Sequence, residues 1–292
     1  MKFLGLPLAL WFVSLGLVCA QVTVEVALEQ EQFLPNEALA VAVRITNLSG
    51  QSLQLGADAA WLTFSVESSE NRVILKTGEV PVAGEFKLDS AKRAIKRVDV
   101  SPYFNLSQPG HYTLTATVKL KEWNQQITSP PKPLDIIAGT KLWEQEFGVP
   151  GKPGQNTRTP EIRKYTLQQA NYLRKQLMLY FRLSDPAGRL NKVYPIGPMI
   201  SFGQPEPVVD RASRLHVLYQ NGPHSFNYTV FSPDGELLVR QSYDFTSRPR
   251  LRTDTNSVVS VVGGTRRPTS RDLPAPAASE DPPKTAAPAA AP

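Results

Sequence analysis

The stretch that decides the fold is VDVSPYFNLSQPGHYTLTATV, residues 98–118. Its Pro109-Gly110 pair predicts a tight corner, because proline fixes its own φ and glycine accepts conformations that other residues avoid. After the corner, apolar residues alternate with threonines over residues 114–118, which predicts a strand with one buried face. Tyr112 stands at the start of that strand, where its ring can be buried while its hydroxyl reaches back to the backbone of the corner.

This corner resembles the tyrosine corner that precedes strand F in immunoglobulin-like and fibronectin-type sandwiches. The resemblance covers residues 22–138, where about seven or eight short alternating runs are separated by turn residues at the spacing typical of sandwiches. It implies an N-terminal Ig-like β-sandwich over residues 21–138. The chain lacks the cysteine pair of antibody domains, so the resemblance is to the architecture alone and implies no particular function.

A second β-rich domain is predicted over residues 162–264. Asp234-Gly235 separates two strand-like runs and is a strong hairpin signal. Residues 165–178 carry leucines and an alanine at a spacing that also fits a helix. A strand is favoured there, and the helix is kept as the alternative.

Two stretches of biased composition separate and end these domains. Residues 139–161 are predicted to be a linker, because a run rich in proline and glycine follows Pro150. Residues 265–292 are rich in proline and alanine, cannot build a core, and are predicted to be a disordered tail. The predicted fold class is therefore all-β, with an Ig-like β-sandwich, a second antiparallel β-domain and a disordered tail.

Residues 1–20 have the features of a secretory signal peptide. Lys2 supplies a positive start, residues 4–17 are almost purely apolar, and Val18 and Ala20 are the small residues expected before cleavage at Gln21. The apolar run is shorter than the about 20 residues that span a bilayer. We therefore expect export to the periplasm, the cell surface or the medium, with no transmembrane segment after signal cleavage.

Cys19 is the single cysteine, and it lies inside this predicted signal. Signal cleavage after Ala20 would leave a mature chain with no thiol, and therefore with no disulfide, thiolate nucleophile or zinc–thiolate site. The alternative is a lipoprotein anchored through Cys19. Val18 departs from the Leu-x-[Gly/Ala/Ser]-Cys pattern of bacterial lipoproteins, which disfavours this alternative.

No motif for catalysis, metal binding or cofactor binding is found in the sequence. There is no HExxH, no Gly-x-Ser-x-Gly elbow, no P-loop and no Gly-x-Gly-x-x-Gly. The three histidines, His111, His216 and His224, are interpreted as surface or packing residues, although His216 and His224 could approach each other across a hairpin. The chain is therefore predicted not to be an enzyme, and no cofactor and no metal are expected.

Positive charge is concentrated in the middle of the chain. Residues 140–264 contain 16 basic and 10 acidic side chains, whereas residues 21–139 contain 11 and 13. Arg248, Arg250 and Arg252 alternate along a predicted strand and would share one face, where they could bind an anionic ligand. The alternative is that they only keep an edge strand hydrated, because Pro249 is also typical of an edge.

These observations favour a non-enzymatic exported protein that serves binding or assembly at the cell envelope. Its partner would be an unknown protein or an anionic polymer of the envelope, and no nucleic acid is expected for an exported chain. One alternative is a carbohydrate-binding accessory or hydrolytic protein, in which Trp61, Trp123 and Trp143 stack on sugars. The other is a peptidase inhibitor that presents a loop within residues 76–92.

Overall fold

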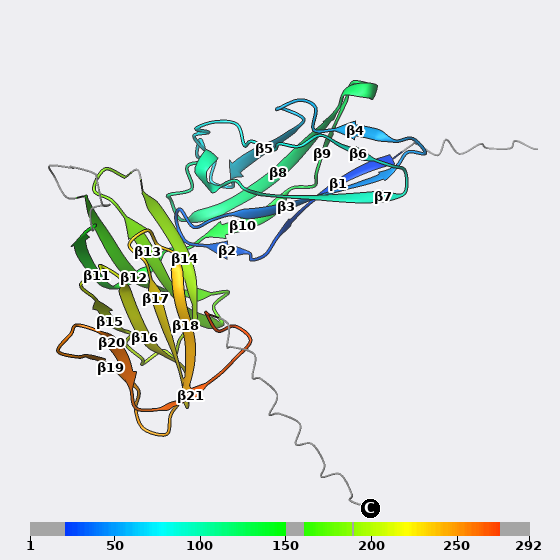
Figure 1. Ribbon diagram of the computed structural model, residues 1–292. Helices are drawn as coiled ribbons and strands as arrows, with labels where there is room; N and C mark the ends of the chain where they lie inside the picture. The colour runs from blue at the N-terminus through cyan, green and yellow to red at the C-terminus, as the bar shows by residue number, and fades with distance from the viewer. Residues whose placement is uncertain (1–20, 150–160, 189, 275–292) are drawn as a thin grey trace, which may run out of the picture.

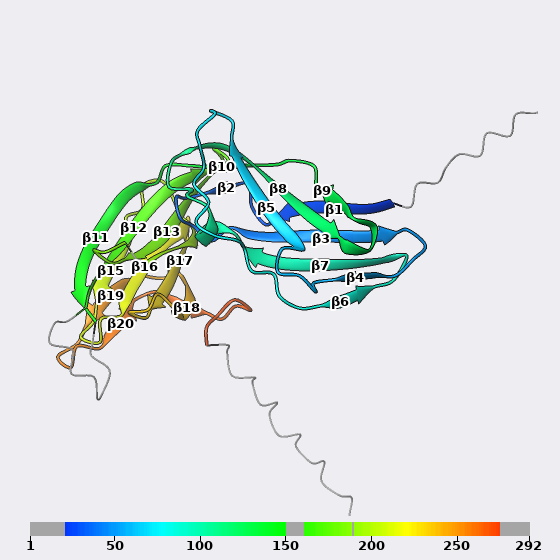
Figure 2. The same cartoon turned by 90° about the horizontal axis from the view of Figure 1, so that it is seen from above.

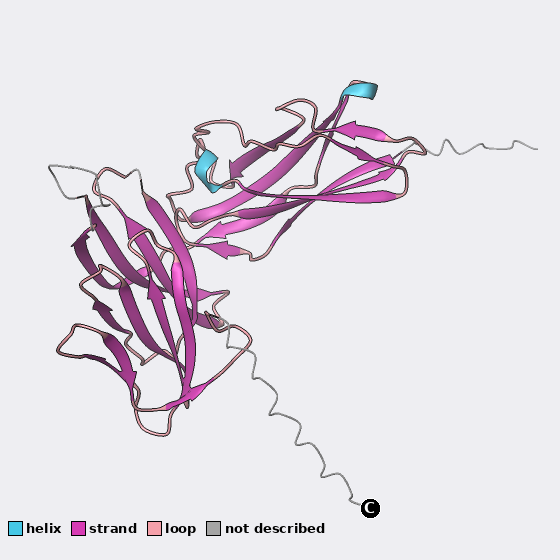
Figure 3. Ribbon diagram, viewed as in Figure 1, coloured by secondary structure: helices cyan, strands magenta, loops and turns pink. Residues whose placement is uncertain are grey.

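The computed structural model describes residues 21–149, 161–188 and 190–274. Within these ranges every regular element is a strand, apart from the short 3-10 helices η1 (Ser101–Tyr103) and η2 (Lys121–Trp123) (Figure 3). The predicted all-β fold is therefore confirmed. No helix among the described residues has both the length and the apolar character needed to cross a membrane.

The strands between residues 21 and 136 enclose one hydrophobic core, and we call this unit the first sandwich. One of its sheets has the order β1 (Gln21–Leu28), β3 (Ala40–Leu48), β7 (Lys92–Asp99). The other has the order β2 (Gln32–Phe33), β10 (Lys132–Ile136), β8 (Gly110–Leu120), β5 (Leu62–Ser68), with β9 (Gln125–Thr128) paired to β8. A two-stranded ribbon consists of β4 (Leu53–Leu55) and β6 (Phe86–Leu88).

The corner before β8 has the geometry that its sequence predicts. The hydroxyl of Tyr112 donates a hydrogen bond to the carbonyl oxygen of Gln108 at 2.7 Å, and the whole residue is only 2% exposed. Leu114, Ala116 and Val118 are fully buried in the core. A single side chain thus ties the corner to the strand whose alternation fills the interior.

The strands from residue 140 onward form a second sandwich, again with one core between two sheets. The first of its sheets has the order β11 (Thr140–Gly148), β12 (Ile162–Tyr172), β13 (Gln176–Ser184), β14 (Asn191–Pro198). The second has the order β15 (Glu206–Val209), β16 (Leu215–Gly222), β17 (Ser225–Phe231), β18 (Leu237–Asp244), β21 (Thr265–Arg267). Phe181 and Phe231 stack across the core with ring centroids 4.1 Å apart.

A separate ribbon covers the outer face of the second sheet. It consists of β19 (Arg250–Thr253) and β20 (Val259–Val262). Leu251 and Val261 of the ribbon pack on a cluster formed by β16 and β17. Both faces of these two strands are therefore covered, which explains why they have nearly continuous buried residues.

The predicted linker over residues 139–161 is wrong for its first half. Residues 140–148 form β11, which pairs with β12 along its whole length. The reason is aromatic packing: the ring of Phe147 stacks on that of Tyr165 at 4.0 Å, and Trp143 packs against the same core. The Pro/Gly-rich residues 150–160 lie outside the described residues.

The helical alternative for residues 165–178 is also wrong, because this segment is the hairpin of β12 and β13. Leu173 and Arg174 adopt positive φ values of 50° and 55° in the turn. Glycine or asparagine usually occupies such positions, so the sequence gives no turn signal there.

The tail predicted from Thr265 begins later than its composition suggests. Residues 265–267 form β21 on the edge of β18, and Leu273 exchanges two backbone hydrogen bonds with Arg240. Between these two points, Arg266 contacts the buried Asp272 at 2.6 Å. Residues 275–292 of the predicted tail and residues 1–20 of the predicted signal lie outside the described residues.

The end of the first sandwich at which β2 and β10 lie meets the second sandwich beside β13 and β14, with the long axes of the two units at an angle (Figures 1 and 2). Leu34, which follows β2, is 1% exposed and packs against Tyr180 and Val193 of the second sandwich. Arg182 donates a hydrogen bond to the carbonyl oxygen of Pro35 at 2.9 Å. The junction thus joins the two units by both packing and hydrogen bonding.

Candidate functional site

The predicted arginines lie together on the outside of the second sandwich. Arg248, Arg250 and Arg252 are all exposed, whereas Pro249 is buried and Leu251 is half-buried against the sheet below. The side chains therefore divide between two faces as the alternation predicts. We call these three residues the arginine row.

The arginine row carries three positive charges without acidic partners. In the part of the chain that the structure describes, none of the three forms an ion pair, although Arg267 of the neighbouring β21 pairs with Asp244 at 3.4 Å. A carboxylate near β19 does exist, but Glu206 accepts a hydrogen bond from the backbone amide of Leu251 at 3.1 Å. Unpaired guanidinium groups on one face suit an anionic ligand with several carboxylates or phosphates.

A groove of about 280 Å³ adjoins the row, and Arg248 forms part of its wall. Phe202, which is 91% exposed, and Phe245, which is 45% exposed, also line it. Phe245 is supported by Phe226, with ring centroids 6.2 Å apart. The groove therefore places exposed aromatic rings beside a cationic group.

Sequence reasoning missed these two phenylalanines. Phe202 lies in the loop between β14 and β15, and Phe245 lies just after β18. Neither belongs to an alternating run, so periodicity gives no sign of their exposure. The one usable signal is a large apolar residue flanked by small polar ones, as in Ser201-Phe-Gly203.

The tryptophans do not gather into a platform. Trp61 is 2% exposed and donates from Nε1 to the carbonyl oxygen of Val82 at 2.9 Å. Trp123 packs on the core of the first sandwich, and Trp143 packs on that of the second. The sugar-stacking surface expected from Trp61, Trp123 and Trp143 is therefore not assembled by these side chains.

Two buried valines anchor the segment over residues 76–92 to the first sandwich. Val80 and Val82 are 4% and 5% exposed, as members of the core of the first sandwich. Residues 86–88 form β6, which pairs with β4. Between Thr77 and Glu85 most of the other residues are exposed, so this part of the segment is a surface loop anchored by its two valines.

His216 is buried in a hydrogen-bonded chain of three side chains. Its Nδ1 lies 2.7 Å from the hydroxyl of Tyr228, and its Nε2 lies 3.2 Å from Oδ2 of Asp210. Burial lowers the pKa of His216 even though Asp210 acts in the opposite direction. Burial also raises the pKa of Tyr228 to about 12, so at neutral pH both groups are uncharged and the chain acts as a structural link.

The other two histidines lie on the surface, away from His216. His224 is exposed in the turn between β16 and β17, whereas His216 pairs with Val230 in the strand register, so the two do not meet. His111 contacts Asp135 at 2.7 Å on the surface of the first sandwich. Among the described residues, no three His, Cys, Asp or Glu side chains are grouped as metal ligands.

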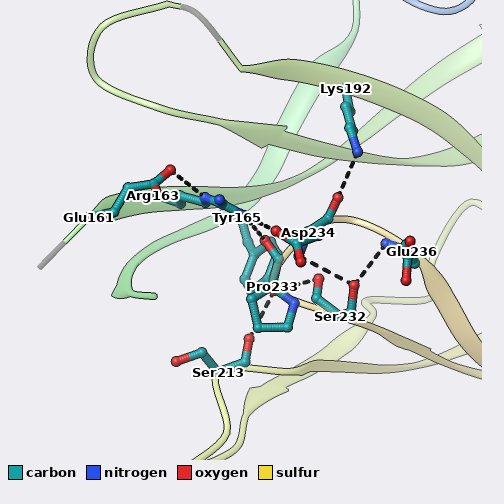
Figure 4. A network of polar contacts seen from close by, with 9 residues as sticks. All are labelled: Glu161, Arg163, Tyr165, Lys192, Ser213, Ser232, Pro233, Asp234 and Glu236. Atoms are coloured by element: carbon teal, nitrogen blue, oxygen red, sulfur yellow. Dashed lines mark hydrogen bonds and ion pairs between the residues drawn. The ribbon is translucent and has the colours of Figure 1, made fainter. Parts of the chain in front are cut away.

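The turn between β17 and β18, residues 232–236, is clamped by the opposite sheet (Figure 4). Arg163 of β12 donates from Nη1 to the carbonyl oxygen of Pro233 and to Oδ1 of Asp234, both at 2.7 Å. Lys192 of β14 donates to the carbonyl oxygen of Asp234 at 2.8 Å. The hairpin predicted at Asp234-Gly235 is confirmed, and the clamp fixes how far apart the two sheets stand at this end.

Comparison with known proteins adds little to this geometry. No family model and no curated protein matches the chain. Among solved structures, the sporulation control protein Spo0M from Bacillus subtilis matches with a TM-score of 0.31 and 8% sequence identity, over 74% of this chain and 79% of that one. A similarity at this level carries no argument about fold or function.

Proposed function

We propose that this protein is an exported, non-enzymatic binding protein of the cell envelope that holds an anionic polymer on the arginine row. Three exposed guanidinium groups without acidic partners, beside a groove with exposed phenylalanines, support this proposal most directly. Carboxylate groups of a polymer would pair with the arginines in the bidentate geometry that guanidinium favours.

Two further inferences belong to this proposal. Export is supported by the signal-like residues 1–20, and cleavage before Gln21 would leave β1, which starts at Gln21, intact. An immunoglobulin-like type for the first sandwich is supported by the hydrogen bond from Tyr112 to Gln108. A rigid first sandwich of this kind would act as a spacer that carries the binding surface.

The experiment measures binding of the mature chain to alginate, a polymer of uronic acids, with neutral dextran as the comparison. We expect binding to alginate alone, and weaker binding at high salt because mobile ions screen exposed charges. The variant with Arg248→Gln, Arg250→Gln and Arg252→Gln should lose about 3- to 150-fold in affinity, since each exposed charge pair contributes about 0.2–1 kcal/mol.

A matched control removes three exposed positive charges from β7 of the first sandwich. The substitutions Lys92→Gln, Arg93→Gln and Arg97→Gln lower the net charge by the same amount, and all three residues are exposed. This variant should keep the affinity of the unmodified chain. Equal losses in the two triple variants would show that only net charge matters, and the proposed site would then be abandoned.

A further inference from the structure

The second sandwich contains a cavity, open to solvent where Tyr194 and Glu236 are exposed, on the opposite side of its second sheet from the arginine row. The cavity has a volume of about 310 Å³ and lies between β14 of one sheet and β17 and β18 of the other. Its walls are mainly apolar, with Tyr194 and Ile196 on one side and Phe231 and Leu237 on the other. This volume is at the lower end of the range for small-molecule sites, which is about 300–1,000 Å³.

Aromatic stacking and the clamped turn support the walls of the cavity. The ring of Phe181 is stacked on that of Phe231 at 4.1 Å and on that of Tyr194 at 6.3 Å. At one end, the clamped turn supplies Gly235, where an added Cβ would lie 3.1 Å from the side chain of Leu183.

A buried hydroxyl in the wall has no hydrogen-bond partner. Thr229 is 1% exposed, and its Oγ1 makes no hydrogen bond within the described residues. An unpaired buried hydroxyl costs about 1–3 kcal/mol. A ligand oxygen in the cavity would remove that cost.

An arginine without an acidic partner stands next to this hydroxyl. Arg240 of β18 is directly opposite Thr229 in the strand register, so the two side chains share the inner face of the sheet. Arg240 is half-buried, lines the cavity, and forms no ion pair with any described residue. Its charge favours ionisation of the nearby Tyr219 hydroxyl, although burial has the larger effect and raises the pKa of Tyr219.

The negative charge of the cavity lies at its other end. Glu236 is the acidic residue in the wall, and it is exposed. It lies four positions before Arg240, in the turn that leads into β18. The cavity is thus polarised, with a sheltered cation at one end and a hydrated carboxylate at the other.

We propose that this cavity binds a small amphipathic anion whose carboxylate is held by Arg240 and Thr229. Its apolar body lies between Tyr194, Ile196 and Phe231. The guanidinium supplies a charge-assisted hydrogen bond, and the hydroxyl of Thr229 donates a second. The inference is independent of polymer binding at the arginine row, because it uses different residues on the other face of the sheet.

Three probes with the same body and different heads test this inference. Octanoate, octanol and octylamine are titrated into the mature full chain at neutral pH, with calorimetry as the readout. Octanoate should bind most tightly. Binding of octylamine above octanoate, equal binding of octanol and octanoate, or no binding of any probe at millimolar concentration would overturn the proposal.

Substitutions then locate the anion. Arg240→Gln should weaken the binding of octanoate about 10- to 100-fold, the range expected for a hydrogen bond to a charged group. The binding of octanol should not change. Arg211→Gln is the matched control, because it removes an exposed positive charge from a turn that does not line the cavity. Unchanged octanoate binding in Arg240→Gln would refute the assignment.

Two further variants guard against a loss that reflects misfolding. Thr229→Val keeps the shape of the side chain but removes the unpartnered hydroxyl. It should weaken the binding of octanoate and leave the melting temperature of the protein unchanged or higher. Ile196→Phe should fill the cavity and abolish binding of octanoate and octanol alike in a chain that still melts cooperatively. A folded Ile196→Phe variant that binds octanoate normally would place the ligand elsewhere.

Discussion

The two sandwiches fill their interiors in different ways. The core of the first is built largely from alternating aliphatic residues, such as Val41, Val43 and Ile45 of β3, which are fully buried. The second buries several tyrosines, and a solvent-open cavity with the unpartnered hydroxyl of Thr229 in its wall lies between its sheets. Dense aliphatic packing favours stability, whereas an interior with polar groups and free space is typical of binding sites. We infer that the first sandwich is the framework and the second carries the binding surfaces.

The largest expected effect is the loss of a core side chain from the first sandwich. Leu114→Ala should lower the free energy of unfolding by about 2–5 kcal/mol, because it removes buried methyl groups and leaves a void. Urea unfolding measures this cost. Lys119→Ala, at an exposed position of the same strand, should change it little. A comparably small effect of Leu114→Ala would contradict the dense packing ascribed to the first sandwich.

The second expected effect concerns the clamp of the second sandwich. Arg163→Met should lower the free energy of unfolding by about 1–3 kcal/mol, because the carbonyl oxygen of Pro233 loses a charged donor. The side chain of Arg163 is only 12% exposed, so water replaces it poorly. Hydrogen exchange should show faster exchange in residues 232–236, with the first sandwich unaffected. Uniform acceleration in both sandwiches would show that the clamp is not local.

A smaller effect is expected at the tyrosine corner. Tyr112→Phe removes one hydroxyl but keeps the buried ring, and should cost about 0.5–1.5 kcal/mol. Tyr112→Leu loses ring packing as well and should cost more. If Tyr112→Phe were neutral in urea unfolding, the hydrogen bond to Gln108 would not stabilise the corner.

The smallest expected effect is a response to pH. Because burial depresses the folded pKa of His216, the unfolded chain binds more protons as the pH falls through the ordinary histidine range near 6.5. The stabilisation from neutral His216 is therefore present above about pH 6.5 and is lost below it. Hydrogen exchange should show weaker protection of β16 and β17 at pH 5.5 than at pH 7. His216→Gln should reduce this difference in protection.

Much of the fold could be predicted from local sequence, because its decisive signals are local. The corner at Tyr112 and the turn at Asp234-Gly235 both lie within a few residues of the strands they join. The hairpin at Leu173 and Arg174 could not be predicted, since neither residue prefers positive φ. The backbone amide of Leu173 donates a hydrogen bond to Oε1 of Gln32 in the first sandwich at 2.6 Å, a contact far away in the sequence. Strand β11 could not be predicted either, because Phe147 stacks on Tyr165, which lies beyond a Pro/Gly-rich run in the sequence.

The sites differ in the same way. The arginine row is an alternation of one residue type in which Arg250 and Arg252 lie in β19 and Arg248 lies just before it, so the sequence places its members on one face. The cavity depends on Tyr194 and Thr229, which come from strands of different sheets. That Thr229 lacks a partner depends on every neighbour around it, and no pattern in one strand reports this.

The short strand β21 has a consequence for self-association. Together with Leu273, it occupies the edge of β18 that would otherwise present unpaired backbone groups to solvent. An open edge of this kind is a template for a strand from another molecule. A chain shortened to end at Gly264 would expose this edge. We expect such a chain to associate through β18 into an extended sheet, which β21 prevents by pairing with that edge.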